Sequence, residues 1–386
     1  MKNIFKFFWL FMFCGISGAS ASVPPDAFYG MPSYLVDAAR AWSGVFSDIR
    51  PSGEISAYIN DLQARDIAKY LDVISVLGFN NTAMAIFETN HHIDRAFDVI
   101  GLPLVSRRNG CAQNLSDCIS RRTFVLDGHI FGAFSDYDSR ENGDFKTQNT
   151  GFTVNAKGFV SDGWLFGVEY TRSMTDTHDT RAYSDATSNS ITMFSQYLSR
   201  SGMFINSGLN AGHTSWTTDK SISKIADDGA YDTDFYSAQI NTGVRLQRGA
   251  ASITPQAIAR YTYMSADKYA DAAVQTFEDW WFNMLNVSAA VDMGVNFVGT
   301  DFVVRPSVQI GGGYDLISHG TDSMRVRLIN GGVYYIPIDT PHRTSLNGEL
   351  GINFYTAHMA AGLNYRIDVR SDYMSHTINA TLKIGF

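Results

Sequence analysis

The sequence predicts an all-β transmembrane barrel of about twelve antiparallel strands, preceded by a short helical segment. From Thr123 onward, apolar and polar residues alternate, as they do in strands that have one apolar and one polar face. The alternating stretches are about twice as long as the usual strand of ~5–6 residues in a globular protein. On the well-patterned strands, charged residues occupy only the polar face. This is expected where the other face meets lipid, because an Arg or Lys facing the middle of a bilayer costs about 2–4 kcal/mol.

The composition suits either a soluble all-β protein or an outer-membrane barrel, so the strand pattern has to decide between them. Charged residues make up 18% of the 386 residues and aromatic residues 13%, and the formal net charge is −8. A soluble β-sandwich also alternates, with its apolar faces inside, but its strands are usually shorter. The negative net charge argues against a nucleic acid as a partner.

Residues 1–21 have the layout of a secretory signal peptide. Two lysines, Lys2 and Lys6, precede an apolar run from Phe7 to Phe13, and small residues follow at the expected cleavage point. A membrane anchor helix is the alternative, but this run is too short to cross a hydrocarbon core of ~30 Å comfortably. The chain is therefore expected to pass through the Sec translocon and to lose its leader. The residues that define the cleavage site are Ala19, Ala21 and Ser22.

Residues 22–122 are expected to form a short helical passenger and linker. From Leu35 to Ile49, apolar residues follow the spacing of three and four that is typical of a helix with one apolar side. Two more amphipathic stretches follow, and Gly78 lies between them as a stop signal before the capping pair Asn80–Asn81. The segment contains no Gly-rich phosphate loop, no H-E-x-x-H and no G-x-S-x-G, so no enzyme activity and no cofactor are expected.

Two histidine motifs are each interpreted as non-catalytic. The pair His91–His92 is expected on a solvated helix face, since adjacent helical positions do not face one ligand. His213 and Ser215 have the H-x-S spacing that places two side chains on the same face of a strand. The polar phase of that strand puts His213 on the lipid side, so a position in the interfacial girdle or at the rim is expected.

The cysteines predict one disulfide. Cys14 lies in the leader, so the mature chain keeps Cys111 and Cys118, an even pair in an oxidising export compartment. The pair is expected to close a small loop. A metal site is not expected, because two thiols without a nearby His do not complete a coordination shell.

The barrel strands follow one another between polar turns, and their even number is typical of an outer-membrane barrel. The strand near 187–199 alternates poorly, and the sequence does not assign its two faces. The expected strands cover 123–134, 147–160, 164–171, 187–199, 201–216, 236–246, 250–264, 285–297, 302–315, 344–355, 359–370 and 376–386.

The charged residues of the well-patterned strands are expected to face the water-filled lumen. Salt bridges among them, or contacts to a helix in the pore, are a simpler interpretation than a catalytic set. These residues are Glu169, Arg245, Arg260, Asp292, Arg305, Glu349, Arg366, Asp368 and Lys383.

The final stretch, HTINATLKIGF, alternates strictly and carries an apolar residue at every second position. Such a strand offers an exposed edge that another sheet can pair with before the barrel closes. It is therefore expected to act as an assembly signal. The residues of this signal are Ile378, Ala380, Leu382, Ile384 and Phe386.

Taken together, these stretches resemble the C-terminal translocator domain of classical (type V) autotransporters of Gram-negative bacteria. FVLDGHIFGAF opens the barrel after a helical segment, GWLFGVEYT resembles the third strand of the family, and the terminal stretch resembles the signal read by the barrel-assembly machinery. The resemblance covers residues 123–386. It implies a twelve-stranded barrel in the outer membrane, a helix threading its pore, and export of an N-terminal passenger to the cell surface.

The resemblance also implies partners: outer-membrane lipid, periplasmic chaperones, the barrel-assembly machinery and the chain's own N-terminal segment in the pore. The sequence departs from the family in having only about a hundred residues before the barrel, too few for the usual long β-helical passenger. Some members cleave themselves at an Asn-Asn pair close before the barrel, but helix capping explains Asn80–Asn81 better. A surface adhesin or structural protein with a vestigial passenger is the alternative function.

Overall fold

The computed structural model describes most of the predicted barrel and two helical pieces before it. The predicted leader, Cys111, Cys118, Asn80–Asn81 and Phe386 lie outside the described residues. The described ranges are 36–41, 82–98, 124–138, 144–161, 163–179, 182–199, 201–222, 225–270, 275–328, 331–356 and 358–385.

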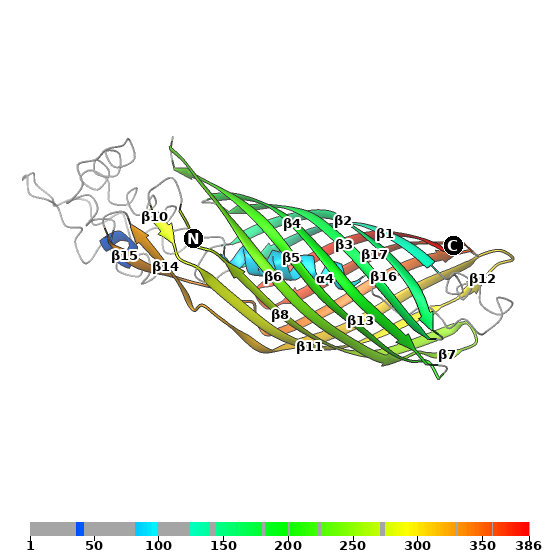
Figure 1. Cartoon of the computed structure of the whole chain (residues 1–386). Coiled ribbons are helices and arrows are strands. Elements are labelled where there is room, and N and C mark those ends of the chain that lie inside the picture. The colour runs from blue at the N-terminus through cyan, green and yellow to red at the C-terminus, as the bar shows by residue number, and fades with distance from the viewer. Residues whose placement is uncertain are drawn as a thin grey trace, which may run out of the picture.

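Long antiparallel strands form a closed barrel of twelve, as predicted (Figure 1). Each strand pairs with the next along the chain, and the last strand pairs with the first from Val125 opposite Gly385 to Tyr137 opposite Tyr373. The short strands β7 (Leu246–Arg248) and β12 (Phe297–Val298) extend the wall. The twelve are β1 (Phe124–Tyr137), β2 (Phe145–Ser161), β3 (Trp164–Asp179), β4 (Ala182–Leu198), β5 (Met203–Ile222), β6 (Ile225–Val244), β8 (Ala251–Ala266), β11 (Trp280–Val295), β13 (Val303–Gly320), β16 (Thr344–Tyr355), β17 (Met359–Arg370) and β18 (Tyr373–Gly385).

The two ends of the barrel differ. One end, called here the turn end, holds the start of β1, the end of β18 and short connections such as the one between β4 and β5, where Gly202 has a φ of +87° that glycine adopts without strain. The opposite end, called here the loop end, carries the longest strand extensions, including the hairpin of β5 and β6. Several strands reach further toward the loop end than predicted: β6 begins at Ile225, against a predicted start at 236.

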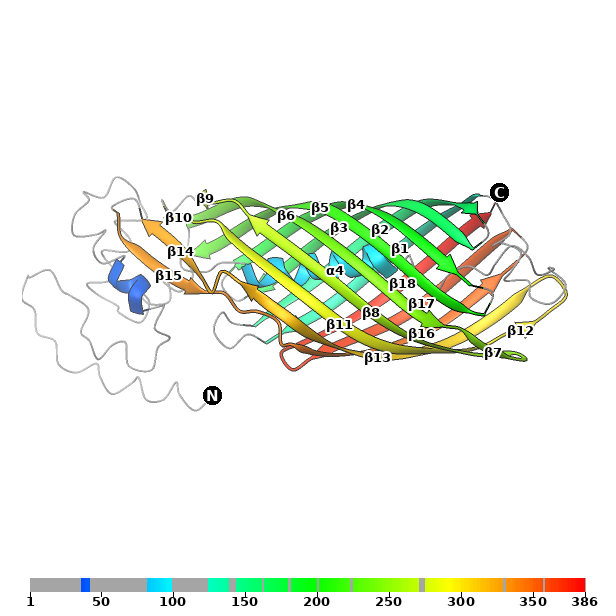
Figure 2. The same ribbon diagram turned by 60° about the horizontal axis from the view of Figure 1, so that its bottom comes forward.

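A second sheet lies at the loop end (Figures 1 and 2). It has the order β15, β14, β10, β9, and the sequence did not predict it. The connection between β8 and β11 provides β9 (Tyr269–Ala270) and β10 (Gln275–Phe277). The connection between β13 and β16 provides β14 (Ser323–Leu328) and β15 (Val333–Pro337). This second sheet is called the cap sheet below.

The helix α4 (Thr82–Asp98) lies inside the barrel (Figure 2). It corresponds to the third predicted helix, and nearly all of its side chains are buried because the barrel wall surrounds it. A shorter helical piece, residues 36–41, lies within the first predicted helix. Among the described residues, no helix is both long enough and apolar enough to cross a membrane.

The wall has an apolar exterior and a polar interior. Large apolar side chains such as Ile130, Leu209 and Leu346 are exposed on the outside, whereas Thr153, Thr192 and Thr377 are buried on the inside. This inversion of a globular core is what lipid outside and a polar lumen require.

The faces of β4, which the sequence left unassigned, follow the same rule. Ile191 and Met193 are exposed on the outside, and Ser190 and Thr192 point inward. Phe194 also points inward, so an apolar ring lies on the otherwise polar inner face of this strand. Its ring lies over Gly167 on β3, where a Cβ would lie 2.3 Å from the ring's ζ carbon, so a glycine is needed at this contact.

Candidate functional site

The candidate functional site is the pore with α4 inside it. The first turns of α4 lie near the loop end, where the Phe87 ring is 4.4 Å from that of Tyr137 and 5.1 Å from that of Tyr373. The last turn reaches the middle of the wall, where the Asp98 carboxylate is 3.0 Å from the Arg366 guanidinium on β17. The helix α4 therefore runs from the loop end to the middle of the barrel, in the direction of the turn end, where β1 begins.

One side of α4 is hydrogen-bonded to β2, β3 and β4. The buried Glu88 carboxylate accepts hydrogen bonds from Thr147 at 2.7 Å and from Asn149 at 3.2 Å. The ring of His92 lies between two hydroxyls, 2.7 Å from Ser173 and 2.8 Å from Ser190. A neutral imidazole satisfies both contacts by donating from one nitrogen and accepting at the other.

The interpretation of His91–His92 as a solvated helix face was wrong. Both side chains are buried, because every side of a helix inside a barrel faces the wall. Adjacent helical positions point in different directions, so His92 contacts β3 and β4 while His91 hydrogen-bonds to the Tyr373 hydroxyl on β18.

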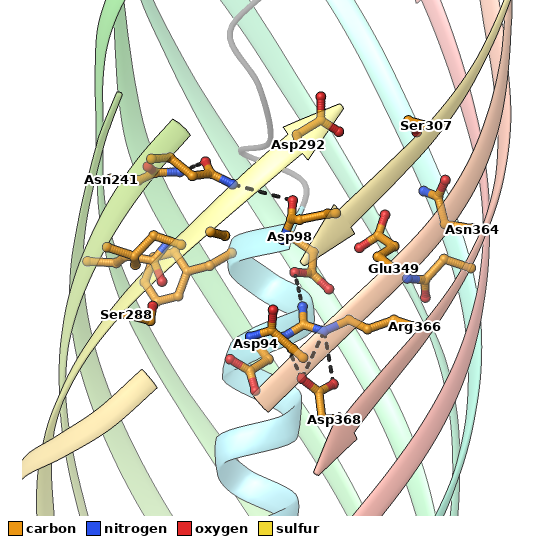
Figure 3. Close-up of a pocket in the computed structure, with 18 of the residues that line it drawn as sticks. Asp94, Asp98, Asn241, Ser288, Asp292, Ser307, Glu349, Asn364, Arg366 and Asp368 are labelled. Atoms are coloured by element: carbon orange, nitrogen blue, oxygen red, sulfur yellow. Dashed lines mark hydrogen bonds and ion pairs between the residues drawn. The ribbon is translucent and has the colours of Figure 1, made fainter. Parts of the chain in front are cut away.

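The opposite side of α4 is held by ion pairs (Figure 3). Asp94 pairs with Arg260 on β8, and Asp98 pairs with Arg366, which also contacts Asp368 at 2.9 Å. The acidic residues lie four positions apart and therefore on one side of the helix. The sequence predicted Arg260 and Arg366 as lumen-facing but did not single out Asp94 and Asp98. Their spacing of four residues could have indicated two carboxylates on one side of the helix.

A polar cavity of about 390 Å³ lies beside these ion pairs, between α4 and the wall formed by β8 to β17. Within it, Arg305 pairs with Asp292, and Ser252 lies 3.3 Å from the same guanidinium. Among the described residues, no cluster of His, Cys, Asp and Glu is arranged to hold a metal ion. The cavity is lined by Arg245, Arg260, Asp292, Arg305, Glu349, Arg366, Asp368 and Lys383 among others.

A second set of charges joins the strands on both sides of the closing seam. The Asp127 carboxylate on β1 lies 2.5 Å from the Lys157 ammonium on β2 and 3.6 Å from the Lys383 ammonium on β18. Glu169 on β3 is buried, with its carboxylate 3.4 Å from the Thr171 hydroxyl. Sequence reasoning missed Asp127 and Lys157.

The remaining predicted residues lie on the outer face. Ile378, Leu382 and Ile384 are exposed on the outside of β18, and Ala380 lies opposite Ile130 of β1. His213 is exposed on the outside of β5, as predicted, and its ring is 2.8 Å from the Asp234 carboxylate. Its other nitrogen lies 3.4 Å from the Ser215 hydroxyl, so this H-x-S pair faces away from the lumen.

Residues 128–366, more than half of the chain, match the model of the autotransporter beta-domain family. No protein of curated function matches the chain significantly. Among solved structures, the chain is similar to the translocator domain of the autotransporter NalP from Neisseria meningitidis, with 12% identity, a TM-score of 0.62, and coverage of 79% of this chain and 97% of that one. It is also similar to the beta domain of the Bordetella autotransporter BrkA, with 10% identity, a TM-score of 0.54, and coverage of 68% and 100%.

The structural similarities, at these low identities, show the fold, and the family match is independent of them. Both agree with the closed barrel of antiparallel strands. The chain belongs to the autotransporter beta-domain family, and its barrel is a translocator in the outer membrane of a Gram-negative bacterium.

Proposed function

We propose that the barrel exports the chain's own N-terminal segment, residues 22–81, and displays it at the cell surface. The direction of α4 is the observation that carries this proposal. In outer-membrane barrels the short turns face the periplasm and the longer loops face the outside. The first turns of α4 lie near the loop end, so the N-terminal end of this helix faces the outer side, which supports export of the residues that precede it.

In this proposal α4 stays in the pore after export. Its contacts include the buried Glu88 carboxylate and the ion pair between Asp94 and Arg260. Removing one partner of a buried ion pair typically costs about 3–5 kcal/mol, because the other charge is left uncompensated. Withdrawal of the helix would break several such contacts at once, which favours a permanent plug.

We further propose that the barrel has no enzymatic role. Most of the charged side chains that line the cavity pair with α4 or with one another, as Arg366 and Arg305 do. These pairings support a structural function. The Sec translocon, periplasmic chaperones and the barrel-assembly machinery remain proposed partners, the last through the alternating sequence of residues 376–386.

Labelling of cysteines in intact cells tests the proposal. Asp37→Cys and Ala250→Cys would be made in a background in which Cys111 and Cys118 are alanine. Asp37 is exposed in the segment to be exported, and Ala250 is exposed in a turn-end connection. A membrane-impermeant maleimide should label position 37 in intact cells and position 250 only after the outer membrane is permeabilised. Labelling of position 37 only after permeabilisation would refute the proposal.

A further inference from the structure

The cap sheet has one apolar buried face and one exposed face. Ile336 on β15 is 1% exposed, and its neighbour Tyr335 is 53% exposed on the other face. Val326 on β14 and Phe277 on β10 are fully buried like Ile336. A sheet with one apolar face needs a second layer to cover it.

The helical piece 36–41 contributes to the same buried core. Ala38 is 0% exposed and Ala39 1%, and both belong to the hydrophobic cluster that contains Val326 and Ile336. On the other side of this helix, Asp37 and Arg40 are exposed and form an ion pair at 3.4 Å. Figures 1 and 2 both show the piece beside β14 and β15. It therefore packs its apolar side toward the core of the cap sheet.

The cap sheet is also fixed to the barrel. An aromatic stack links the hairpin of β5 and β6 to the sheet, with ring centroids 6.1 Å apart between Trp216 and Tyr231, 4.7 Å between Tyr231 and Tyr269, and 4.6 Å between Tyr269 and Phe277. The Lys220 ammonium lies 4.8 Å from the Phe277 ring centroid. These contacts are continuous and mostly buried, so they hold the cap sheet against the hairpin of β5 and β6.

We propose that the cap sheet is the docking surface for the exported segment, so that residues around Ala38 and the two loops fold into one surface unit. The inference rests on the proposed function, since the segment has to cross the membrane before it can dock. Residues 36–41 reach the apolar core of the sheet only when the segment is outside. Docking therefore holds the segment outside by mass action, because it stabilises the exported state and not the periplasmic one.

Protease protection in intact cells tests the proposal. An epitope would be placed after Ser22, and the rate at which an external protease removes it from the barrel would be measured. Ala38→Asp on the segment and Ile336→Asp on the sheet each put a carboxylate into the shared core. Each should speed cleavage at least tenfold. Tyr335→Asp, on the exposed face of the same strand, is the matched control and should cleave like the wild type.

The gel shift on heating shows whether each barrel has folded. If Ile336→Asp prevents folding, Ala38→Asp still decides the question, because it lies outside the barrel. The double variant should cleave no faster than the faster single variant, since both remove one interaction. Wild-type cleavage rates in Ala38→Asp would overturn the docking proposal. An epitope that becomes accessible only after permeabilisation would instead refute export itself.

Discussion

The ion pair between Asp94 and Arg260 should contribute strongly to keeping α4 in the pore. The side chains of Asp94 and Arg260 are 26% and 11% exposed, so the pair is largely shielded but borders the polar cavity. Removal of one partner from a buried pair costs about 3–5 kcal/mol. Water in the cavity can rehydrate the remaining charge, so we expect about 3 kcal/mol for Asp94→Ala and for Arg260→Ala.

A change of about 3 kcal/mol corresponds to a roughly 100-fold increase in the population of the undocked helix, since 1.36 kcal/mol is tenfold. An isolated helix of this length is marginal in water, so the undocked helix should unfold and exchange its amide hydrogens. Hydrogen exchange measured by mass spectrometry should therefore show α4 amides exchanging about 100-fold faster in either variant. Amides in the barrel strands should be unchanged.

The double variant and one control complete the test. Asp94→Ala combined with Arg260→Ala should exchange no faster than either single variant, because each single change already breaks the contact and leaves a charge unpaired that the double variant removes. Asp292→Ala breaks the pair with Arg305, which joins two strands without touching α4, and should leave α4 exchange unchanged. Equal acceleration in Asp292→Ala, or none in Asp94→Ala, would refute the assignment of this pair as an anchor of the helix.

Three further predictions concern the wall and the linker. Gly167→Ala should destabilise the barrel by about 1–3 kcal/mol, since the new methyl would overlap the Phe194 ring. The midpoint temperature of the heat-dependent gel shift should therefore fall. An unchanged midpoint would mean that the ring moves freely. Adding Phe194→Ala should recover part of this loss. Deletion of Phe386 should lower the yield of assembled barrel while the folded molecules melt close to wild type, because one aromatic side chain contributes only about 2–3 kcal/mol; normal yield would contradict a role in assembly. Cys111 and Cys118 should be joined by a disulfide in mature protein, and titration of two free thiols in protein from the native envelope would disprove the bond.

The alternation of apolar and polar residues predicted the strands well where the wall meets lipid. It did not predict how far the strands extend beyond the membrane. On β6, the alternation is clear from Tyr236 onward, where the outer face is apolar. Before it, Asp232 and Asp234 occupy the outer face while Tyr231 and Phe235 point inward, so the apolar and polar faces exchange places and the apolar outer face that marks the other strands is lost. For the same reason the loop-end extensions were predicted too short.

The contacts of the pore helix were harder to predict than the wall. An amphipathic pattern identifies a helix, but it does not say that polar residues such as Glu88 and His92 will meet the wall of a polar lumen. The ordinary expectation is that such residues face water. Inside this barrel the surrounding wall supplies hydroxyl and amide partners instead, which only the tertiary structure reveals.

The strands of the cap sheet are too short for the alternation of apolar and polar residues to predict them. β14 alternates over six residues, and its partner β10 has only three. Runs of this length occur in many loops, and their buried faces are set by contacts with Ala38 and with the barrel rim rather than by period. Local patterns could not have identified this layer.

The charged residues where β18 pairs with β1 affect which register the barrel adopts when it closes. Asp127 and Lys157 lie on neighbouring strands of one hairpin, so their pair can form before the last strand arrives. Lys383 comes opposite Asp127 only in the observed register of β18 on β1. A slip of one residue would turn every side chain of β18 to the other face and place Lys383 against lipid, at a cost of about 2–4 kcal/mol. The Lys383 ammonium group therefore destabilises a barrel closed in the shifted register, and it stabilises the observed register through its contact with Asp127.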